Sequence, residues 1–289
     1  MAARAAVEAL LREKKLDRTL TSALPERLGE DAVAPLDTEA LDRGLAGGLP
    51  RGQVSEVVGP ASSGRTSVAW AALAAASRRG ESIALIDTCD RFDPPTAQAC
   101  GIDLSRLLWV RGQALSKTSG AVDPAWLPGV RAVSGPGTLL ERVIDRAIKA
   151  LNLVVSSGVC TLVVIDLIDL PPVALRRLPA STWFRIERAI EHSDTAVLIL
   201  AAQPVARSSG GRSISLGTGH PAPGTAPDKT AFPDRNAPPD RNASPGVLWA
   251  GAHDRSRRVS GVRAHANLSA ARWSHPRQVD ITTAVANAV

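Results

Sequence analysis

The sequence contains no tyrosine, only one methionine and only three cysteines. Cys89, Cys100 and Cys160 show no CxxC spacing, so the sequence predicts neither a disulfide framework nor a zinc site. No segment reaches the roughly 18 uncharged apolar residues that cross a bilayer, and the amino-terminal segment lacks the apolar core of a signal peptide. We therefore expect a cytoplasmic protein that does not bind membranes.

The charge is basic but is weak evidence of function. The net charge of +6 comes mostly from arginine, and a basic surface attracts nucleic acid or acidic proteins. Abundant alanine and arginine without tyrosine are also what a GC-rich bacterial genome produces. The cluster of Arg255, Arg257, Arg258 and Arg263 is accordingly either a DNA-binding surface or a solvated turn.

From about residue 50 onward, short aliphatic runs alternate with helical patterns. This alternation predicts an α/β fold with a mostly parallel central sheet and helices on both faces. After residue 246, apolar runs separated by short turns predict antiparallel strands. The predicted strands of the parallel part are 54–58, 82–87, 161–166 and 196–202, and the predicted helices are 66–78, 95–100, 138–155 and 181–192.

The chain is expected to have one main core. Residues 1–35 are predicted to form an amphipathic helix and a linker, 36–283 the core, and 284–289 a tail. Within the core, 111–136 and 206–245 are predicted to be irregular. The second of these is rich in Ser, Gly, Pro, Asp and Asn, and such a composition buries too little apolar surface to fold.

The segment Gly59–Ser67 is the strongest local signal of a phosphate-binding loop. It lies directly after a predicted strand and opens a predicted helix. Its glycines let backbone N–H groups and the helix N-terminus face an anion, and Thr66 can offer its hydroxyl to Mg²⁺. Arg65 stands where such loops have lysine, and a planar guanidinium is not equivalent to a compact ammonium. We predict a weak or absent site for ATP or ADP with Mg²⁺; the alternative is a turn without ligand. The loop residues are Gly59, Pro60, Ala61, Ser62, Ser63, Gly64, Arg65, Thr66 and Ser67.

Asp166 ends a predicted strand and is the second candidate of this site. A carboxylate at the C-terminal end of a neighbouring strand can hold the water shell of Mg²⁺, because ligands of open α/β sheets bind at that edge. Thr66 and Asp166 are therefore the predicted metal-binding residues. An aspartate at the end of a strand is also common in ordinary turns.

The order of these motifs resembles RecA-type recombinases. The resemblance begins at LDRGLAGGLPRGQVSEVVGPASSGRTS, continues through IALIDTCDRFDPPTAQACGIDLSRLLWV, TLVVID and AVLILAAQ, and ends at VSGVRAHANLSAARWSHPRQVDIT. It implies that roughly residues 36–283 form a RecA-like P-loop core, which a C-terminal antiparallel hairpin closes. It also implies that Gln203 senses the γ-phosphate and relays its state to the following loop.

Two departures from the family pattern bear on activity. Cys89 stands where RecA-type proteins carry the glutamate that activates the attacking water, and a thiol cannot replace that carboxylate. The loop at 206–245 does not resemble the recombinase loop, so strand exchange is not implied. We predict no catalytic residue and little or no ATPase activity. The alternative is an active DNA-stimulated ATPase or recombination regulator in which Asp87 or Asp90 takes over, although Asp90 is expected to point the other way.

A RecA-like core with these substitutions, a short N-terminal helix and no separate C-terminal domain is most similar to ImuA-type accessory proteins of bacterial inducible mutagenesis. The resemblance implies an SOS-linked adaptor in translesion synthesis after DNA damage. The implied partners are an ImuB-like polymerase-related protein and an error-prone replicative-type polymerase, with RecA, the sliding clamp and DNA as further partners. A weak similarity of such sequences to SulA leaves a cell-division inhibitor as a third candidate.

Overall fold

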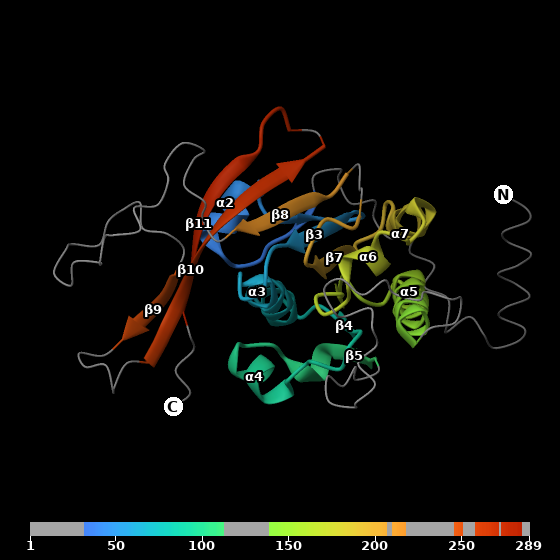
Figure 1. Ribbon diagram of the computed structural model, residues 1–289, viewed down its shortest axis with the longest axis horizontal. Helices are drawn as coiled ribbons and strands as arrows, with labels where there is room; N and C mark the ends of the chain where they lie inside the picture. Colours follow the sequence, from blue (N-terminus) through green and yellow to red (C-terminus); the bar gives the residue numbers. More distant parts are fainter. Residues whose placement is uncertain are drawn as a thin grey trace, which may run out of the picture. The chain divides into compact units, whose positions relative to one another are not determined.

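The protein is described by a computed structural model (Figure 1). Residues 1–31 of the predicted amino-terminal helix and linker, nearly all of the loop 111–136, and residues 285–289 of the predicted tail lie outside the described residues. The described residues are 32–112, 139–206, 210–217, 246–250, 258–271 and 273–284.

A nine-stranded sheet forms the centre of the fold, in the order β11-β10-β8-β3-β7-β6-β4-β5, with β9 paired to β10. The strands from β8 to β5 in this order run parallel, whereas β10 pairs antiparallel with β8, β9 and β11. The predicted parallel sheet with antiparallel C-terminal strands is therefore confirmed. The strands are β3 (Val54–Val58), β4 (Ile83–Asp87), β5 (Leu107–Arg111), β6 (Leu162–Asp166), β7 (Ala196–Ala201), β8 (Arg212–Gly217), β9 (Gly246–Ala250), β10 (Arg258–Ala270) and β11 (Arg277–Ala284).

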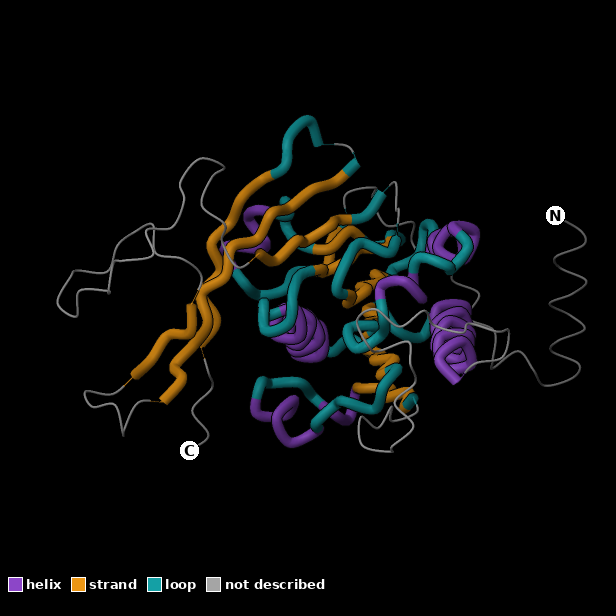
Figure 2. The backbone as a smooth tube through the Cα atoms, viewed as in Figure 1, coloured by secondary structure: helices purple, strands orange, loops and turns teal. Residues whose placement is uncertain are grey.

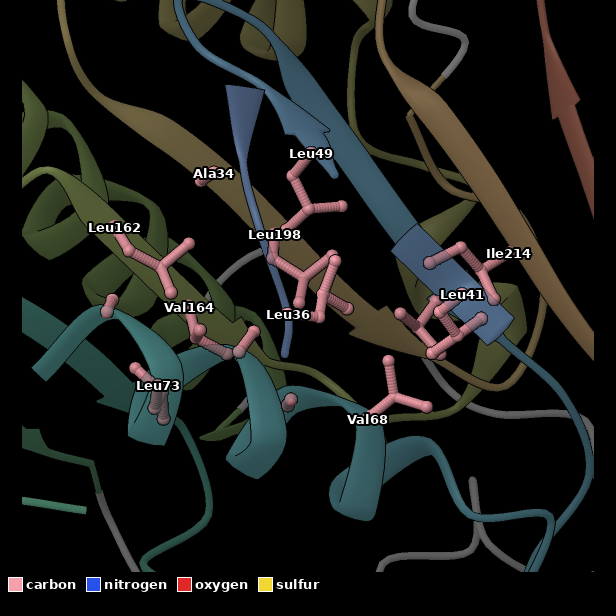
Figure 3. Packing of buried hydrophobic residues seen from close by; sticks show 14 of the residues in the cluster. Ala34, Leu36, Leu41, Leu49, Val68, Leu73, Leu162, Val164, Leu198 and Ile214 are labelled. Atoms are coloured by element: carbon pink, nitrogen blue, oxygen red, sulfur yellow. The ribbon is translucent and has the colours of Figure 1, made fainter. Parts of the chain in front are cut away.

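Helices cover both faces of the parallel strands (Figures 1 and 2). The helix α3 (Arg65–Arg78) packs on one face, and α5 (Leu139–Ser157) and α7 (Ala180–Ile190) pack on the other. Successive residues of each strand point to opposite faces, which is why unbroken aliphatic runs mark strands buried on both sides. Figure 3 shows the α3 side of the core, where Val68 and Leu73 of α3 belong to one buried cluster with Leu162, Val164 and Leu198 of the sheet.

Short elements frame the sheet. The strands β1 (Val33–Ala34) and β2 (Leu49–Pro50) form a separate two-stranded ladder, and α2 (Glu39–Gly44) packs against β11. A Cβ on Gly44 would lie 2.5 Å from Leu268 and 2.6 Å from Val279, so glycine allows α2 to approach this closely. The remaining short helices of the described residues are α4 (Pro94–Ala99), the 3₁₀ helix Leu104–Arg106 and α6 (Pro172–Leu175).

The prediction that 206–245 forms one irregular loop is wrong for β8 (Arg212–Gly217). Ile214 and Leu216 are buried and alternate with serines, and β8 pairs with β3 through this segment. The surrounding Ser- and Gly-rich composition hid a period-two apolar pattern that is typical of a strand. Residues 218–245 lie outside the described part of the chain.

Candidate nucleotide-binding site

The loop between β3 and α3 has the backbone that the sequence predicts. Gly59 has a φ of 157°, and a Cβ there would lie 2.4 Å from the carbonyl oxygen of Leu216 on β8. Gly64, the N-cap of α3, has a φ of 93° with open space around it, so its backbone conformation alone favours glycine. Glycine is therefore favoured at the two positions for different reasons. Close packing against β8 favours it at position 59, and the left-handed backbone conformation favours it at position 64.

The N-terminus of α3 is suited to an anion. The first turn of α3 contains no acidic residue, and Gly64 has no side chain with which to cap the backbone N–H groups. Thr66 and Ser67 are exposed at this turn, whereas Ser63 is buried. The positive end of the helix dipole and the N–H groups of the turn thus remain available to a phosphate.

Arg65 points into the protein. Its side chain is only 6% exposed, and its Nη1 donates a hydrogen bond of 3.0 Å to the carbonyl oxygen of Ala201, at the end of β7. Burial lowers the pKa of Arg65, and the nearby carboxylates of Asp166 and Asp169 oppose this shift. In this conformation the guanidinium binds the edge of the sheet.

A cleft of about 330 Å³ opens beside α3 at the C-terminal ends of β4 and β6. Thr66 and Asp166, the predicted metal-binding residues, both line it. Asp87, Arg91 and Asp169 are its other charged residues. The structure therefore brings the two predicted residues together, in a cleft that combines three carboxylates with one guanidinium. The remaining lining residues are Ala69, Trp70, Leu85, Phe92, Ile168 and Leu200.

Asp166 is partly buried, and burial raises its pKa to about 6. The backbone N–H of Ile168 donates to its Oδ1 at 2.9 Å and lowers the pKa, while the carboxylates of Asp87 and Asp169 raise it. A divalent cation in the cleft would favour the ionised form, since opposite charge stabilises a carboxylate. The side chain can hold Mg²⁺ near neutral pH, where it is mostly ionised.

Arg91 and Asp169 form an ion pair on the wall of the cleft. Nε of Arg91 lies 2.9 Å from Oδ2 of Asp169, with side-chain exposures of 49% and 35%. The pair connects the loop after β4 with the loop after β6. Sequence analysis missed both residues; the only signal was that Asp169 follows Asp166 by three positions.

The two carboxylates considered as replacement bases are both engaged in hydrogen bonds. Buried Asp87 accepts from the backbone N–H of Arg91 at 2.8 Å, the N–H of Phe92 at 2.9 Å and Nε1 of Trp109 at 3.2 Å. Asp90 binds Nε and Nη2 of Arg111, each at 2.9 Å, which lowers the pKa of Asp90. Asp87 therefore shapes the loop after β4, and Asp90 is held by Arg111.

Cys89 is buried, and burial together with the carboxylates of Asp169 and Asp166 raises its pKa to about 12. A thiol with such a pKa stays protonated near neutral pH and is a poor base and a poor nucleophile. A protonated thiol thus stands at the position that resembles the water-activating glutamate, and it is unsuited to activating water.

Gln203 is exposed and accepts a hydrogen bond of 2.9 Å from Nη1 of Arg176. It does not line the cleft that holds Thr66 and Asp166. The segment after Gln203 is fixed by Glu56, a buried carboxylate on β3, which accepts from the N–H groups of Val205 at 3.1 Å and Ala206 at 3.2 Å. Glu56 was not singled out from the sequence, although a charge inside an aliphatic strand is a signal in itself.

No helix in the described part of the chain has the length and apolar character needed to span a bilayer.

Comparison with known proteins relates part of the chain to RecA. Residues 25–118 match the RecA N-terminal domain. Protein RecA of Lactobacillus delbrueckii subsp. bulgaricus is 35% identical over 145 residues, which cover 45% of this chain and 43% of that protein. Protein RecA of Chlorobaculum tepidum is 41% identical over 123 residues, covering 37% of this chain and 36% of that protein. The chain thus spans less than half the length of these curated relatives.

A crystal structure of the RadB recombinase aligns with a TM-score of 0.48 and 16% sequence identity, covering 86% of this chain and 94% of that one. The segment that matches the RecA N-terminal domain contains the loop Gly59–Ser67, together with Asp87, Cys89 and Arg91. Asp166 and Asp169 lie beyond it.

Proposed function

We propose that this RecA superfamily protein is an accessory adaptor of damage-induced translesion synthesis that binds nucleotide but hydrolyses it little or not at all. The observation that carries the proposal is the chemistry after β4. Cys89 stays a neutral thiol, and its neighbours Asp87 and Asp90 are engaged by the loop backbone and by Arg111. A hydrolytic site needs a group that orients and activates water, and these side chains are poorly suited to that task.

Retained nucleotide binding is supported by the loop and the cleft. The N–H groups around Gly64 and the start of α3 can receive phosphate oxygens, and the Thr66 hydroxyl and Asp166 carboxylate can hold Mg²⁺. Bound Mg²⁺ would neutralise phosphate charge beside the carboxylates. Nucleotide would then act as a structural ligand or a switch.

The adaptor role rests on the resemblance to ImuA-type proteins. The proposed partners are an ImuB-like polymerase-related protein and an error-prone replicative-type polymerase, with RecA and the sliding clamp nearby. Gel filtration of purified proteins tests this role. The chain, mixed with the ImuB-like protein and the error-prone polymerase with and without Mg·ADP, should give a stable assembly. Failure to bind either partner under both conditions would contradict the adaptor.

Nucleotide turnover gives the sharper test. Mg·ATP binding by calorimetry, followed by phosphate release with and without single-stranded DNA, should show binding but no release above that of Asp166→Asn. Because Thr66 and Asp166 share one cleft, a working DNA-stimulated ATPase is the second candidate. Turnover that DNA stimulates and Asp166→Asn abolishes would establish that candidate instead.

A further inference from the structure

Among the described residues, the phosphate loop itself supplies no cation to the cleft. A P-loop lysine reaches the β- and γ-phosphates, but Arg65 at that position is buried and donates to Ala201. The carboxylates of Asp87, Asp166 and Asp169 line the same cleft, so its fixed charge opposes a polyphosphate. Nucleotide binding here is therefore favoured by a cation from outside the phosphate loop in addition to Mg²⁺.

We propose that Arg91 is the phosphate-binding cation of this cleft and that Asp169 occupies its guanidinium when no nucleotide is bound. This inference rests on the proposed nucleotide site and deepens it. Of the described residues that line the cleft, Arg91 is the one with a cationic side chain. It lies on the same cleft as Thr66, so its guanidinium can approach a phosphate held at the start of α3.

The backbone of Arg91 is fixed while its head group is held lightly. Its N–H donates to the buried carboxylate of Asp87 at 2.8 Å, which anchors the loop. Its guanidinium is about half exposed and contacts Asp169 through Nε at 2.9 Å. Exposed ion pairs of this kind are weak, whereas a guanidinium binds phosphate through two parallel hydrogen bonds. A phosphate can therefore replace Asp169 without rearranging the loop.

The exchange would couple occupancy to the loop after β6. Asp169 lies between Asp166, the predicted Mg²⁺ ligand, and α6. The ion pair between Arg91 and Asp169 therefore joins the loop after β6 to the loop after β4. When a phosphate binds the Arg91 guanidinium, the ion pair between Arg91 and Asp169 breaks, and the Asp169 side chain can rearrange. Nucleotide would thereby change the surface around α6 without hydrolysis, which is what a non-hydrolysing switch requires.

Arg111 is a matched control for Arg91. It also pairs with an aspartate of the loop after β4, Asp90, but it does not line this cleft. Mg·ADP affinity of the full chain, measured by calorimetry, should fall tenfold or more in Arg91→Ala and stay within twofold in Arg111→Ala. Arg91→Lys should be intermediate, because it keeps the charge but loses the fork. Circular dichroism and urea unfolding verify that each variant is folded.

Asp169→Ala separates competition from general electrostatics. If Asp169 competes with phosphate for Arg91, Asp169→Ala should tighten Mg·ADP severalfold in the wild-type background. On top of Arg91→Ala the gain should be clearly smaller, because only the loss of the repulsive charge then remains. Equal tightening in both backgrounds would mean that only its negative charge matters, and it would overturn the exchange.

The outcomes also distinguish this inference from the proposed function. Wild-type binding that Arg91→Ala leaves unchanged overturns the inference alone. DNA-stimulated hydrolysis with Arg91-dependent affinity overturns the non-hydrolysing function alone. Absence of Mg·ADP binding by the wild-type chain overturns both the inference and the nucleotide-binding part of the function.

Discussion

Nη1 of Arg65 lies 3.0 Å from the carbonyl oxygen of Ala201, so the side chain that begins α3 is tied to the end of β7. The bond satisfies a buried carbonyl group and places a positive charge within electrostatic reach of Asp166 and Asp169. Arginine at this position is thereby a structural counter-ion for a carboxylate-rich sheet edge. In this role Arg65 stabilises the loop and does not itself bind phosphate.

Arg65→Ala should therefore destabilise the protein. The substitution removes a buried hydrogen bond to a charged donor and leaves the Ala201 carbonyl unpaired, which costs about 2–3 kcal/mol of unfolding free energy. Urea unfolding measures the loss. Arg43→Ala, in an exposed pair with Glu39, is the control and should change stability by less than about 0.5 kcal/mol. Similar effects of the two substitutions would argue against a structural Arg65.

Asp166→Asn should alter how stability depends on pH. The pKa of Asp166 is about 6 in the folded protein against an ordinary 3.8, so the folded state holds the proton more tightly. The stabilising contribution of the protonated Asp166 carboxyl is complete below about pH 4 and is lost as the pH rises through about 6. The wild type should therefore lose about 2–3 kcal/mol relative to Asp166→Asn between pH 4 and pH 7.

The measurement is urea unfolding of both proteins across this pH range. Asp145→Asn serves as the control, because Asp145 is an exposed carboxylate paired with Lys149 on α5. Its difference from the wild type should change little with pH. A pH-independent difference between Asp166→Asn and the wild type would show that Asp166 titrates normally.

Alkylation should distinguish the cysteines. Burial raises the pKa values of Cys89 and Cys160, whereas Cys100 is exposed. At pH 8, iodoacetamide should label Cys100 quickly and leave the other two unmodified in the folded protein, because the thiolate is the reactive form. Peptide mass spectrometry reads the sites, and denatured protein labelled at all three is the control. Rapid labelling of Cys89 would contradict an inert thiol at this position.

The sheet and the Thr66–Asp166 pairing could be predicted because both depend on local rules. Unbroken aliphatic runs mark strands buried on two faces, and residues at the C-terminal ends of neighbouring parallel strands meet at one edge. The pairing of Arg91 with Asp169 could not be predicted, since it joins two loops 78 residues apart. The direction of Arg65 likewise depends on a carbonyl group of β7, which no local pattern reveals.

The same distinction explains Gln203. Its place after an aliphatic strand is correct, but its side chain meets Arg176 and does not line the cleft. The backbone path after β7 is determined by Glu56, on a strand that lies about 150 positions earlier in the chain. A sequence motif predicts where a residue stands along its own strand and leaves open which neighbour it faces.

Glu56→Ala should loosen this segment. The carboxylate accepts hydrogen bonds from the backbone N–H groups of Val205 and Ala206 and from the hydroxyl of Ser213 at 3.0 Å. Without it, two partly or fully buried N–H groups lose their acceptor, which costs about 2–4 kcal/mol of unfolding free energy. Hydrogen exchange at the amides of Val205 and Ala206 should accelerate well before global unfolding, because the loss is local.

Ser213→Ala is the matched control, since it removes one donor to Glu56 and leaves the carboxylate and both backbone bonds in place. It should cost about 1 kcal/mol and leave exchange at the amides of Val205 and Ala206 nearly unchanged. If Glu56→Ala also leaves that exchange unchanged, the carboxylate does not hold the segment. If exchange accelerates and Mg·ADP affinity stays the same, the segment that carries Gln203 is independent of the nucleotide cleft. A parallel fall in affinity would mean that the cleft and this segment are coupled through β3 and β7, whose C-terminal ends flank the phosphate loop.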